Sequence, residues 1–343
     1  LGDVYKRQAM VEVHGLLIKY LATSEDDVDA ALNSKAGQLD TDDDGDDTRN
    51  AREKQMDVLF ERLFERFLDL TTFVRTKAIQ VCGRLCDLAV RLPTQRLRMT
   101  SLAVQSLEDK SSNVRRNAIA LLVKLVLTHP YGVMHGGELN ADAWTQRRDV
   151  VRSELEKAEE RLAFPVTEEG EADAGIDGED QDQGDEDMSG RMSSRSGKPR
   201  RSELDLDALA ATQQSMTHAE HEKLVKLRLT MTYYEDALKF IHLLEQGVPI
   251  LVQLLASTNK AEVLESMEFF RVAHEYKIHG ASDGVRAMIH LIWTKDNALV
   301  MEDGSQLKGI RSRLIEVYRS LYFDPYPGLS RSEHVALVCR NMI

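Results

Sequence analysis

The chain has 343 residues, of which 42% are hydrophobic and 29% are charged. A chain of this length and composition can bury a large core, which excludes a wholly disordered protein, a disulfide-stabilised miniprotein and a collagen. Its three cysteines are too few for a disulfide framework and suit a reducing compartment. Only seven residues are proline, which favours a helical protein.

The net charge of −13 conceals parts of opposite sign. Residues 25–47 hold ten acidic groups and one lysine, and residues 165–190 hold eleven acidic groups and no base, so the rest of the chain carries +7. Acidic segments this poor in apolar side chains cannot bury enough surface to offset their ordering entropy. We therefore expect disordered acidic insertions in a structured remainder that is basic.

In chain order, residues 1–9 do not join smoothly to the apolar segment that follows, and we expect a non-native or disordered start. The helical period of apolar side chains in residues 10–22 predicts one amphipathic helix. Residues 23–50 are expected to form an acidic disordered loop. Residues 51–164 are dense in helical pattern and are expected to form helical hairpin repeats.

Residues 165–202 are expected to form a disordered linker, which is acidic at first and then basic and rich in serine. Residues 203–343 again predict helical hairpins, the last of which is opened by the capping box Ser330–Glu333 and is expected to be cut off at the chain's end. Because no useful length alternates with a period of two, we expect essentially no sheet. Helix breaks are expected at 247–249, 257–259, 280–282, 296–305 and 324–327.

An internal repeat with an offset of 40 residues is the most informative feature. Asp69 and Val74-Arg75 recur as Asp109 and Val114-Arg115, and the apolar pairs Ala78/Ala118, Ile79/Ile119 and Leu85/Leu125 keep the same offset. This period is typical of HEAT repeats, in which each hairpin covers the apolar face of the next. Each aspartate is placed to cap the second helix and meet an arginine of a neighbouring turn. We predict an all-α HEAT-repeat α-α superhelix with disordered acidic insertions; a compact helical bundle is the alternative.

Catalytic and metal-binding patterns are weak. Cys82 and Cys86 lie four residues apart among apolar neighbours, which favours buried thiols over zinc ligands. His218 and His221 lie three apart on a predicted helix without an evident third ligand. The sequence contains no phosphate-binding loop, nucleophile elbow or calcium loop. We therefore predict a protein that is not an enzyme and has no cofactor and no metal.

Basic residues gather in residues 72–128, which hold ten bases and three acids. In stacked repeats, equivalent positions align on one face, where cations can contact phosphates of any DNA sequence. Arg75 and Arg115 can instead tie neighbouring repeats together, and ordinary solvated surface is an alternative for the others. The DNA-binding candidates are Lys77, Arg84, Arg116, Lys124, Arg96 and Arg98.

The basic end of the second linker places three serines beside arginines, a pattern that suits basophilic kinases. These candidate phosphorylation sites are Ser193, Ser196 and Ser202. A plain solvated tail is the alternative.

Four blocks of the sequence resemble one family. They are residues 64–93, 115–131, 233–257 and 269–325, and the last, with IWTKD and GIRSRLIEVYRSLYFDP, is not a generic HEAT pattern. These blocks resemble the condensin subunit 1 family, the HEAT-repeat regulatory subunits of eukaryotic condensin. The chain is similar to a central part of such a subunit.

The resemblance implies a non-catalytic subunit that binds the kleisin and SMC ATPase subunits and contacts DNA or chromatin, with histones as further partners, to support mitotic chromosome condensation. It implies a location in the nucleus and on chromosomes, with a cytoplasmic pool, and neither a membrane nor a small-molecule substrate. A HEAT-repeat adaptor of another class, such as a transport receptor or a phosphatase scaffold, is the alternative function.

Overall fold

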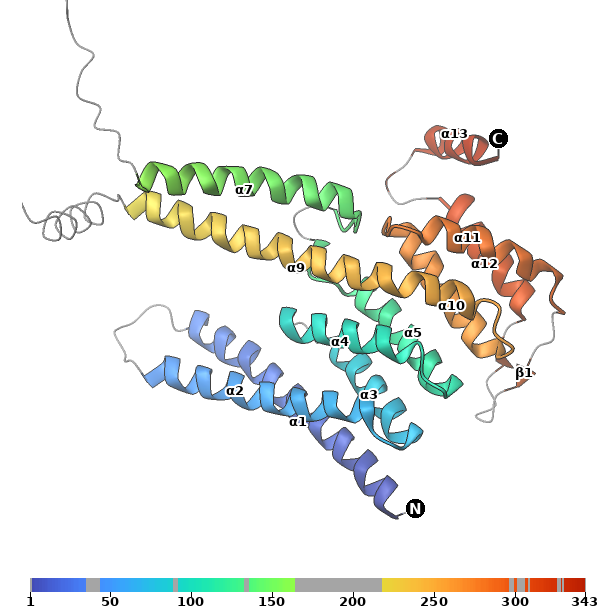
Figure 1. The fold of residues 1–343 in the computed structure, drawn as a ribbon, viewed down its shortest axis with the longest axis horizontal. Coiled ribbons are helices and arrows are strands. Elements are labelled where there is room, and N and C mark those ends of the chain that lie inside the picture. The colour runs from blue at the N-terminus through green and yellow to red at the C-terminus, as the bar shows by residue number, and fades with distance from the viewer. Residues whose placement is uncertain are drawn as a thin grey trace, which may run out of the picture. The chain divides into compact units, whose positions relative to one another are not determined.

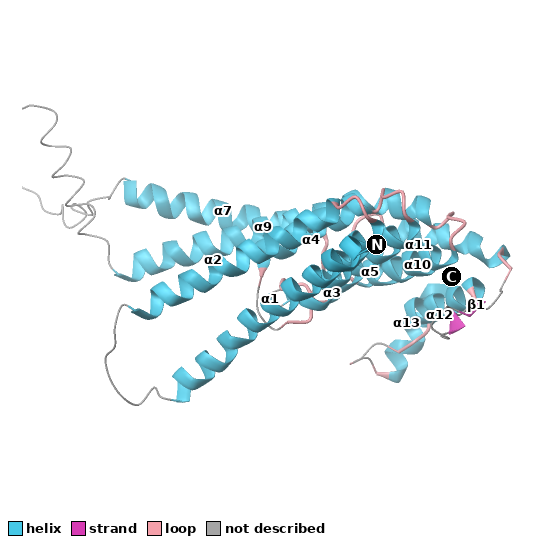
Figure 2. Ribbon diagram, turned by 90° about the horizontal axis from the view of Figure 1, so that it is seen from below, coloured by secondary structure: helices cyan, strands magenta, loops and turns pink. Residues whose placement is uncertain are grey.

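The computed structural model describes residues 2–34, 44–88, 92–132, 136–163, 218–295, 299–300, 306–307, 309–325, 328 and 330–342. Helices dominate these residues in both views of the chain (Figures 1 and 2). Contacts divide the chain into a first unit, Leu1–Gln146 with Tyr234–Ile343, and a second unit, Arg147–Tyr233. Within the described residues, no helix combines the length and the apolar character needed to cross a membrane.

The first unit contains most of the elements. They are α1 (Gly2–Ser34), α2 (Asp44–Glu65), the 3-10 helix η1 (Arg66–Leu68), α3 (Thr72–Leu85), α4 (Pro93–Ser106), α5 (Ser112–Leu127), the start of α7 (Ala141–Ala163), the end of α9 (His218–Leu254), α10 (Lys260–Glu275), α11 (Ala281–Met288), the 3-10 helix η2 (Ile289–Trp293), α12 (Ile310–Tyr322) and α13 (Arg331–Met342). The second unit holds the rest of α7 and α9, where Arg228 and Glu159 form an ion pair at 2.9 Å.

Five helices of the first unit form one row. α1 packs against α3, α3 against α5, α5 against α10 and α10 against α12. α4 packs against α5, while α2 packs against α1 and α4. Because α10 lies beside α5 although α7 and α9 separate them in the sequence, the stacking of hairpins continues across the insertion. The predicted all-α architecture of helical repeats is confirmed.

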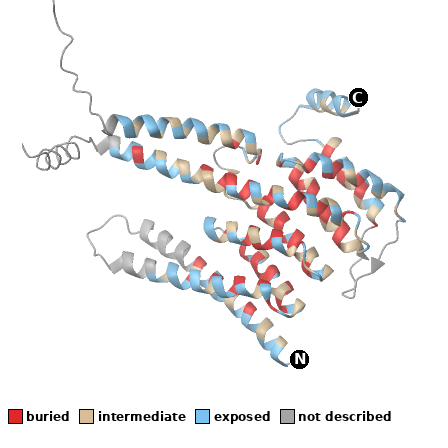
Figure 3. Ribbon diagram, viewed as in Figure 1, coloured by how far each residue is buried: buried red, intermediate tan, exposed pale blue. Residues whose placement is uncertain are grey.

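The 40-residue repeat has a structural counterpart in the core. Val74 and Val114 are fully buried, and Ile79 and Ile119 are at most 1% exposed. Figure 3 shows buried residues concentrated on α3, α5, α10 and the adjoining part of α9. α5 is covered by a neighbour on each side, so eight of its side chains are buried, while Ala120 and Leu127 stay exposed.

The beginning of the chain differs from expectation. Residues 2–9 belong to α1, and Arg7 in this segment pairs with Asp69, so these residues are helical and not disordered. The irregular sequence hides a helical stripe in which Val4, Arg7 and Val11 face inward. Helix α1 also continues to Ser34 and α2 begins at Asp44, so helix covers part of the predicted acidic loop; residues 35–43 and the second linker lie outside the described residues.

The predicted helix breaks agree with the structure at some positions only. Helix α9 continues through Gly247 and Pro249. A Cβ atom at Gly247 would lie 3.4 Å from Leu107 and 3.5 Å from Val104, so this glycine serves close packing rather than a turn. The capping box is confirmed where α13 begins: the Glu333 carboxylate accepts the Ser330 backbone N–H at 2.9 Å, and the Ser330 hydroxyl accepts the Glu333 backbone N–H at 3.4 Å. Among the described residues, extended pairing is limited to a two-residue antiparallel ladder between β1 (Leu299–Val300) and β2 (Gln306–Leu307).

Candidate functional site on the row of α1, α3 and α5

Three arginines tie successive helices of the row together. Arg7 Nη1 lies 2.9 Å from Asp69 Oδ1, and the Arg75 guanidinium contacts both Asp109 oxygens at 2.8 and 2.9 Å. One hairpin further on, Arg115 Nη2 lies 2.7 Å from an oxygen of Glu262, whose side chain is fully buried. These ties join α1, α3, α5 and α10 in register.

The aspartates also shape their own turns. Asp69 Oδ1 accepts the Thr71 backbone N–H at 2.9 Å, and Asp109 Oδ1 accepts the Ser111 backbone N–H at 2.8 Å. Arg75 in addition donates to the Asp69 carbonyl oxygen at 2.7 Å. The predicted meeting with an arginine is present, and the contacts of the Val-Arg arginines fit the tying role. The predicted capping differs: Asp69 and Asp109 bond the N–H of the residue before each helix, and the N-cap positions are Thr71 and Ser111.

Two of the DNA-binding candidates on α3 share one acid. Lys77 and Arg84 both form ion pairs with Glu12 of α1. Burial by itself raises the pKa of the Glu12 carboxyl, but the two cations outweigh burial and hold this pKa below its ordinary value. On α5, Lys124 Nζ lies 2.7 Å from Asp87 Oδ1. These three bases therefore already have acidic neighbours.

The remaining candidates lie in different surroundings. Arg116 is half-buried beside Glu265 of α10, whose pKa is raised by burial although the charge of Arg116 opposes that rise. Arg96 is only 9% exposed and donates to the Cys86 carbonyl oxygen at 2.8 Å and to the Thr128 hydroxyl at 2.9 Å. Arg98 is exposed on α4, outside the five-helix row.

The structure thus brings together Lys77, Arg84 and Lys124, with Arg116 toward α10, and separates them from Arg98. Arg96 is the least accessible of the candidates, because its buried guanidinium bonds groups at the contact between α3, α4 and α5. The serines Ser193, Ser196 and Ser202 lie outside the described residues.

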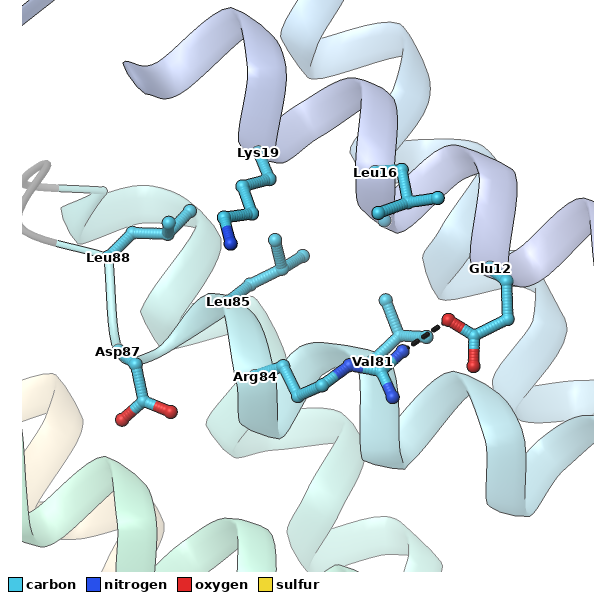
Figure 4. A pocket seen from close by; sticks show the side chains of 9 residues that line it. Glu12, Leu16, Lys19, Val81, Arg84, Leu85, Asp87 and Leu88 are labelled. Carbon is cyan, nitrogen blue, oxygen red and sulfur yellow. Dashed lines mark hydrogen bonds and ion pairs between the residues drawn. The ribbon is translucent and has the colours of Figure 1, made fainter.

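A groove runs between α1 and α3, with a volume of about 490 Å³. Figure 4 shows Leu16 and Lys19 of α1 on one side, facing Leu85 and Leu88 on the other. Sequence reasoning missed this groove, because its walls are far apart in the chain.

The two helices that line the groove approach each other closely at Gly15. A Cβ atom at this position would lie 2.5 Å from Val81 Cγ1, so a larger residue requires Val81 or α1 to shift. Val81 forms part of the groove floor, and Glu12, Arg84 and Asp87 provide its charged rim. The site therefore combines an apolar floor with ion pairs at its edge.

The residues considered as metal ligands do not form a centre. Cys82 and Cys86 are buried, and burial raises the pKa of the Cys86 thiol to about 11. His221 is exposed near the start of α9. In the part of the chain that the structure describes, no three His, Cys, Asp or Glu side chains gather in a way that could hold a metal ion.

Comparison with known proteins gives sequence relatives of one kind. Condensin complex subunit 1 of Saccharomyces cerevisiae is 34% identical over 84% of this chain and 24% of its own length. The protein of the same name from Schizosaccharomyces pombe is 32% identical over 83% of this chain and 23% of its own length. A condensin-1 complex subunit of Arabidopsis thaliana is 26% identical over 87% of this chain and 20% of its own length.

No protein-family model matches the chain. A designed armadillo repeat protein aligns with 76% of this chain and 98% of its own, at 12% identity and a TM-score of 0.17. This score is too low to support a shared fold. The fold assignment rests on the helix contacts themselves. The chain spans about a quarter of the length of the two yeast relatives. Over its aligned residues, the chain is homologous to condensin complex subunit 1 of the two yeasts.

Proposed function

We propose that this chain is part of a non-catalytic regulatory subunit of condensin, which binds the kleisin subunit and DNA and supports mitotic chromosome condensation. The observation that carries the proposal is the homology to condensin subunit 1 across the helical row. The arginine ties support it, because a row held in register presents an extended surface to a long partner.

The proposal also covers the binding partners of the protein and its location in the cell. The SMC ATPase subunits supply ATP hydrolysis, chromatin supplies DNA and histones, and the protein acts in the nucleus and on chromosomes. A HEAT-repeat adaptor of another class, such as a transport receptor or phosphatase scaffold, remains the second candidate, because hairpin repeats serve such proteins as well.

The DNA contact is proposed for Lys77, Arg116 and Lys124, with Arg98 on α4 as a separate candidate. Arg84, which lines the groove between α1 and α3, and the buried Arg96 stay predictions from the sequence. Ion pairs with partly exposed partners contribute only about 0–1 kcal/mol, so phosphates can replace Glu12 and Asp87 as counter-charges. The contact is expected to depend on salt and not on DNA sequence.

A salt series with a random-sequence duplex tests the DNA contact. In the test variant, Lys77, Arg116 and Lys124 are changed to Gln, which avoids placing a new acid beside Glu12, Asp87 or Glu265. Arg84 stays unchanged, because it lines the groove between α1 and α3. The matched control changes three exposed lysines instead, Lys6, Lys223 and Lys226.

If all three bases contact phosphates, the slope of log affinity against log salt falls by about 2 to 3 in the test variant only. Equal slopes for the test variant, the control and the unchanged chain would contradict the DNA contact. Binding of purified kleisin, measured on the same preparations, tests the other half of the proposal. Kleisin binding without DNA binding would indicate a protein scaffold that does not contact DNA. The absence of both kleisin binding and DNA binding would favour the alternative, an adaptor of another class.

A further inference from the structure

We propose that the groove between α1 and α3 takes a short acidic and amphipathic segment of the kleisin partner, whose leucine-type side chains fill the floor and whose carboxylates meet the cations at the rim. This inference rests on the proposed function, because it deepens the kleisin contact by locating one part of it. The groove is formed wholly by described residues of the first unit.

The leucine at the edge of the groove, Leu16, is not required by the repeat fold, because the equivalent positions of the next two helices carry other side chains. Arg7, Arg75 and Arg115 occupy equivalent positions, and nine residues after them come Leu16, Arg84 and Lys124 respectively. The later two helices thus carry a solvated base where α1 carries a leucine. Leu16 is 65% exposed and lines the groove together with the half-exposed Leu88, so apolar surface at this opening is available for another molecule to cover.

The floor beneath Leu16 is apolar as well. Val81 is 1% exposed and Leu85 is 4% exposed, so they form a rigid base, while Leu88 stands half-exposed beyond the end of α3. In Figure 4, Leu16 and Leu88 lie on opposite sides of the opening. A groove of about 490 Å³ with such walls is large enough to take apolar side chains of a peptide.

The rim selects the charge of the partner. Among the described residues, the bases Lys77, Arg84 and Lys124 pair with two acids at the groove, Glu12 and Asp87. Glu12 is shared between two cations, and the Arg84 side chain is 57% exposed. A carboxylate brought by a ligand therefore gives Arg84 a second partner, which favours an acidic segment over a basic one.

A peptide suits the groove better than a duplex does. DNA offers phosphates to the rim, but its backbone would leave Leu16, Leu85 and Leu88 in water, whereas a peptide with alternating apolar and acidic side chains covers both parts.

The experiment uses the complete condensin complex, reconstituted with the full-length subunit. A photo-crosslinking amino acid replaces Leu16 in one preparation and Leu17 in the other. Leu17 is the matched control, because it is 43% exposed on the same helix and does not line the groove. The expected result is a crosslink from position 16, and not from position 17, to one kleisin segment rich in Asp or Glu and leucine. A crosslink from position 16 to a segment without acids, or none from an assembled complex, would overturn the inference.

A second measurement uses affinities. Leu16→Asp and Arg84→Gln are each expected to weaken kleisin binding about tenfold, while Leu17→Asp changes it less than twofold and circular dichroism shows an unchanged fold. Weaker binding of a DNA duplex with unchanged kleisin binding would assign the groove to nucleic acid and overturn the inference. A complex that never incorporates the unchanged subunit refutes the proposed function itself, which separates the two failures.

Discussion

The tie between Arg115 and Glu262 offers the sharpest test of how the row is held together. Glu262 is fully buried in the first turn of α10, and its carboxylate has the Arg115 guanidinium and the Ser257 hydroxyl as partners. The substitution Arg115→Met removes the positive charge while keeping a long apolar side chain. It leaves a buried carboxylate without a counter-charge, which costs about 3–5 kcal/mol of the free energy of unfolding.

The reverse change is expected to cost less. In Glu262→Gln, Arg115 keeps its hydrogen bond to the Asp109 carbonyl oxygen and its side chain is 22% exposed, so water can solvate part of its charge. We expect a loss of about 1–3 kcal/mol. The double variant removes both charges, and its cost is therefore smaller than the sum of the two single costs by at least about 1 kcal/mol.

Urea unfolding followed by circular dichroism measures these free energies, and hydrogen exchange shows whether the loss lies in α5 and α10, which the tie connects. The reasoning is refuted if Arg115→Met costs less than about 1 kcal/mol, or if the two single costs add to that of the double variant.

Three further predictions concern the core. Burial lowers the pKa of His129 to about 4, so the unfolded state binds the proton more readily than the folded state does. The contribution of His129 to the free energy of unfolding is therefore full above pH 6.5 and falls toward pH 4, by on the order of 2 kcal/mol at pH 4.5. Urea midpoints should show this fall, and His129→Gln should reduce it. Gly284→Ala places a Cβ atom 2.0 Å from the buried Phe270 ring and should cost about 1–3 kcal/mol in thermal melting, whereas Gly83→Ala, with no atom within 4 Å, should not destabilise the protein. Iodoacetamide should modify the exposed Cys339 well before the buried Cys82 and Cys86, whose thiol pKa values burial raises; equal rates in intact-mass analysis would contradict the packing.

The repeat could be predicted from the sequence because its signals are local. The spacing between Asp69 and Arg75 places both in one turn, and the copy 40 residues later repeats the geometry. Partners from distant segments could not be predicted in this way. The acid that meets Arg115 is Glu262, on the far side of the insertion, and nothing in the spacing of the repeat points to it.

The charge of the site shows the same limit. Residues 72–128 are strongly basic when they are counted alone, but Glu12 comes from α1 and Glu265 from α10, so folding brings acids to bases that the sequence window leaves unmatched. The helix over residues 2–9 was missed for a related reason. Arg7 is part of the tie series, but its Asp69 partner lies 62 residues later, so the irregular local sequence gave no sign of it.

The most direct test of the central claim is purification of the full-length protein, tagged at its own locus, from mitotic cells. The account predicts that the kleisin and both SMC ATPase subunits of condensin elute with it in equal amounts and that its depletion leaves mitotic chromosomes uncondensed. Recovery of the protein without kleisin and SMC subunits, in a complex with a phosphatase or with transport cargo, would contradict the account.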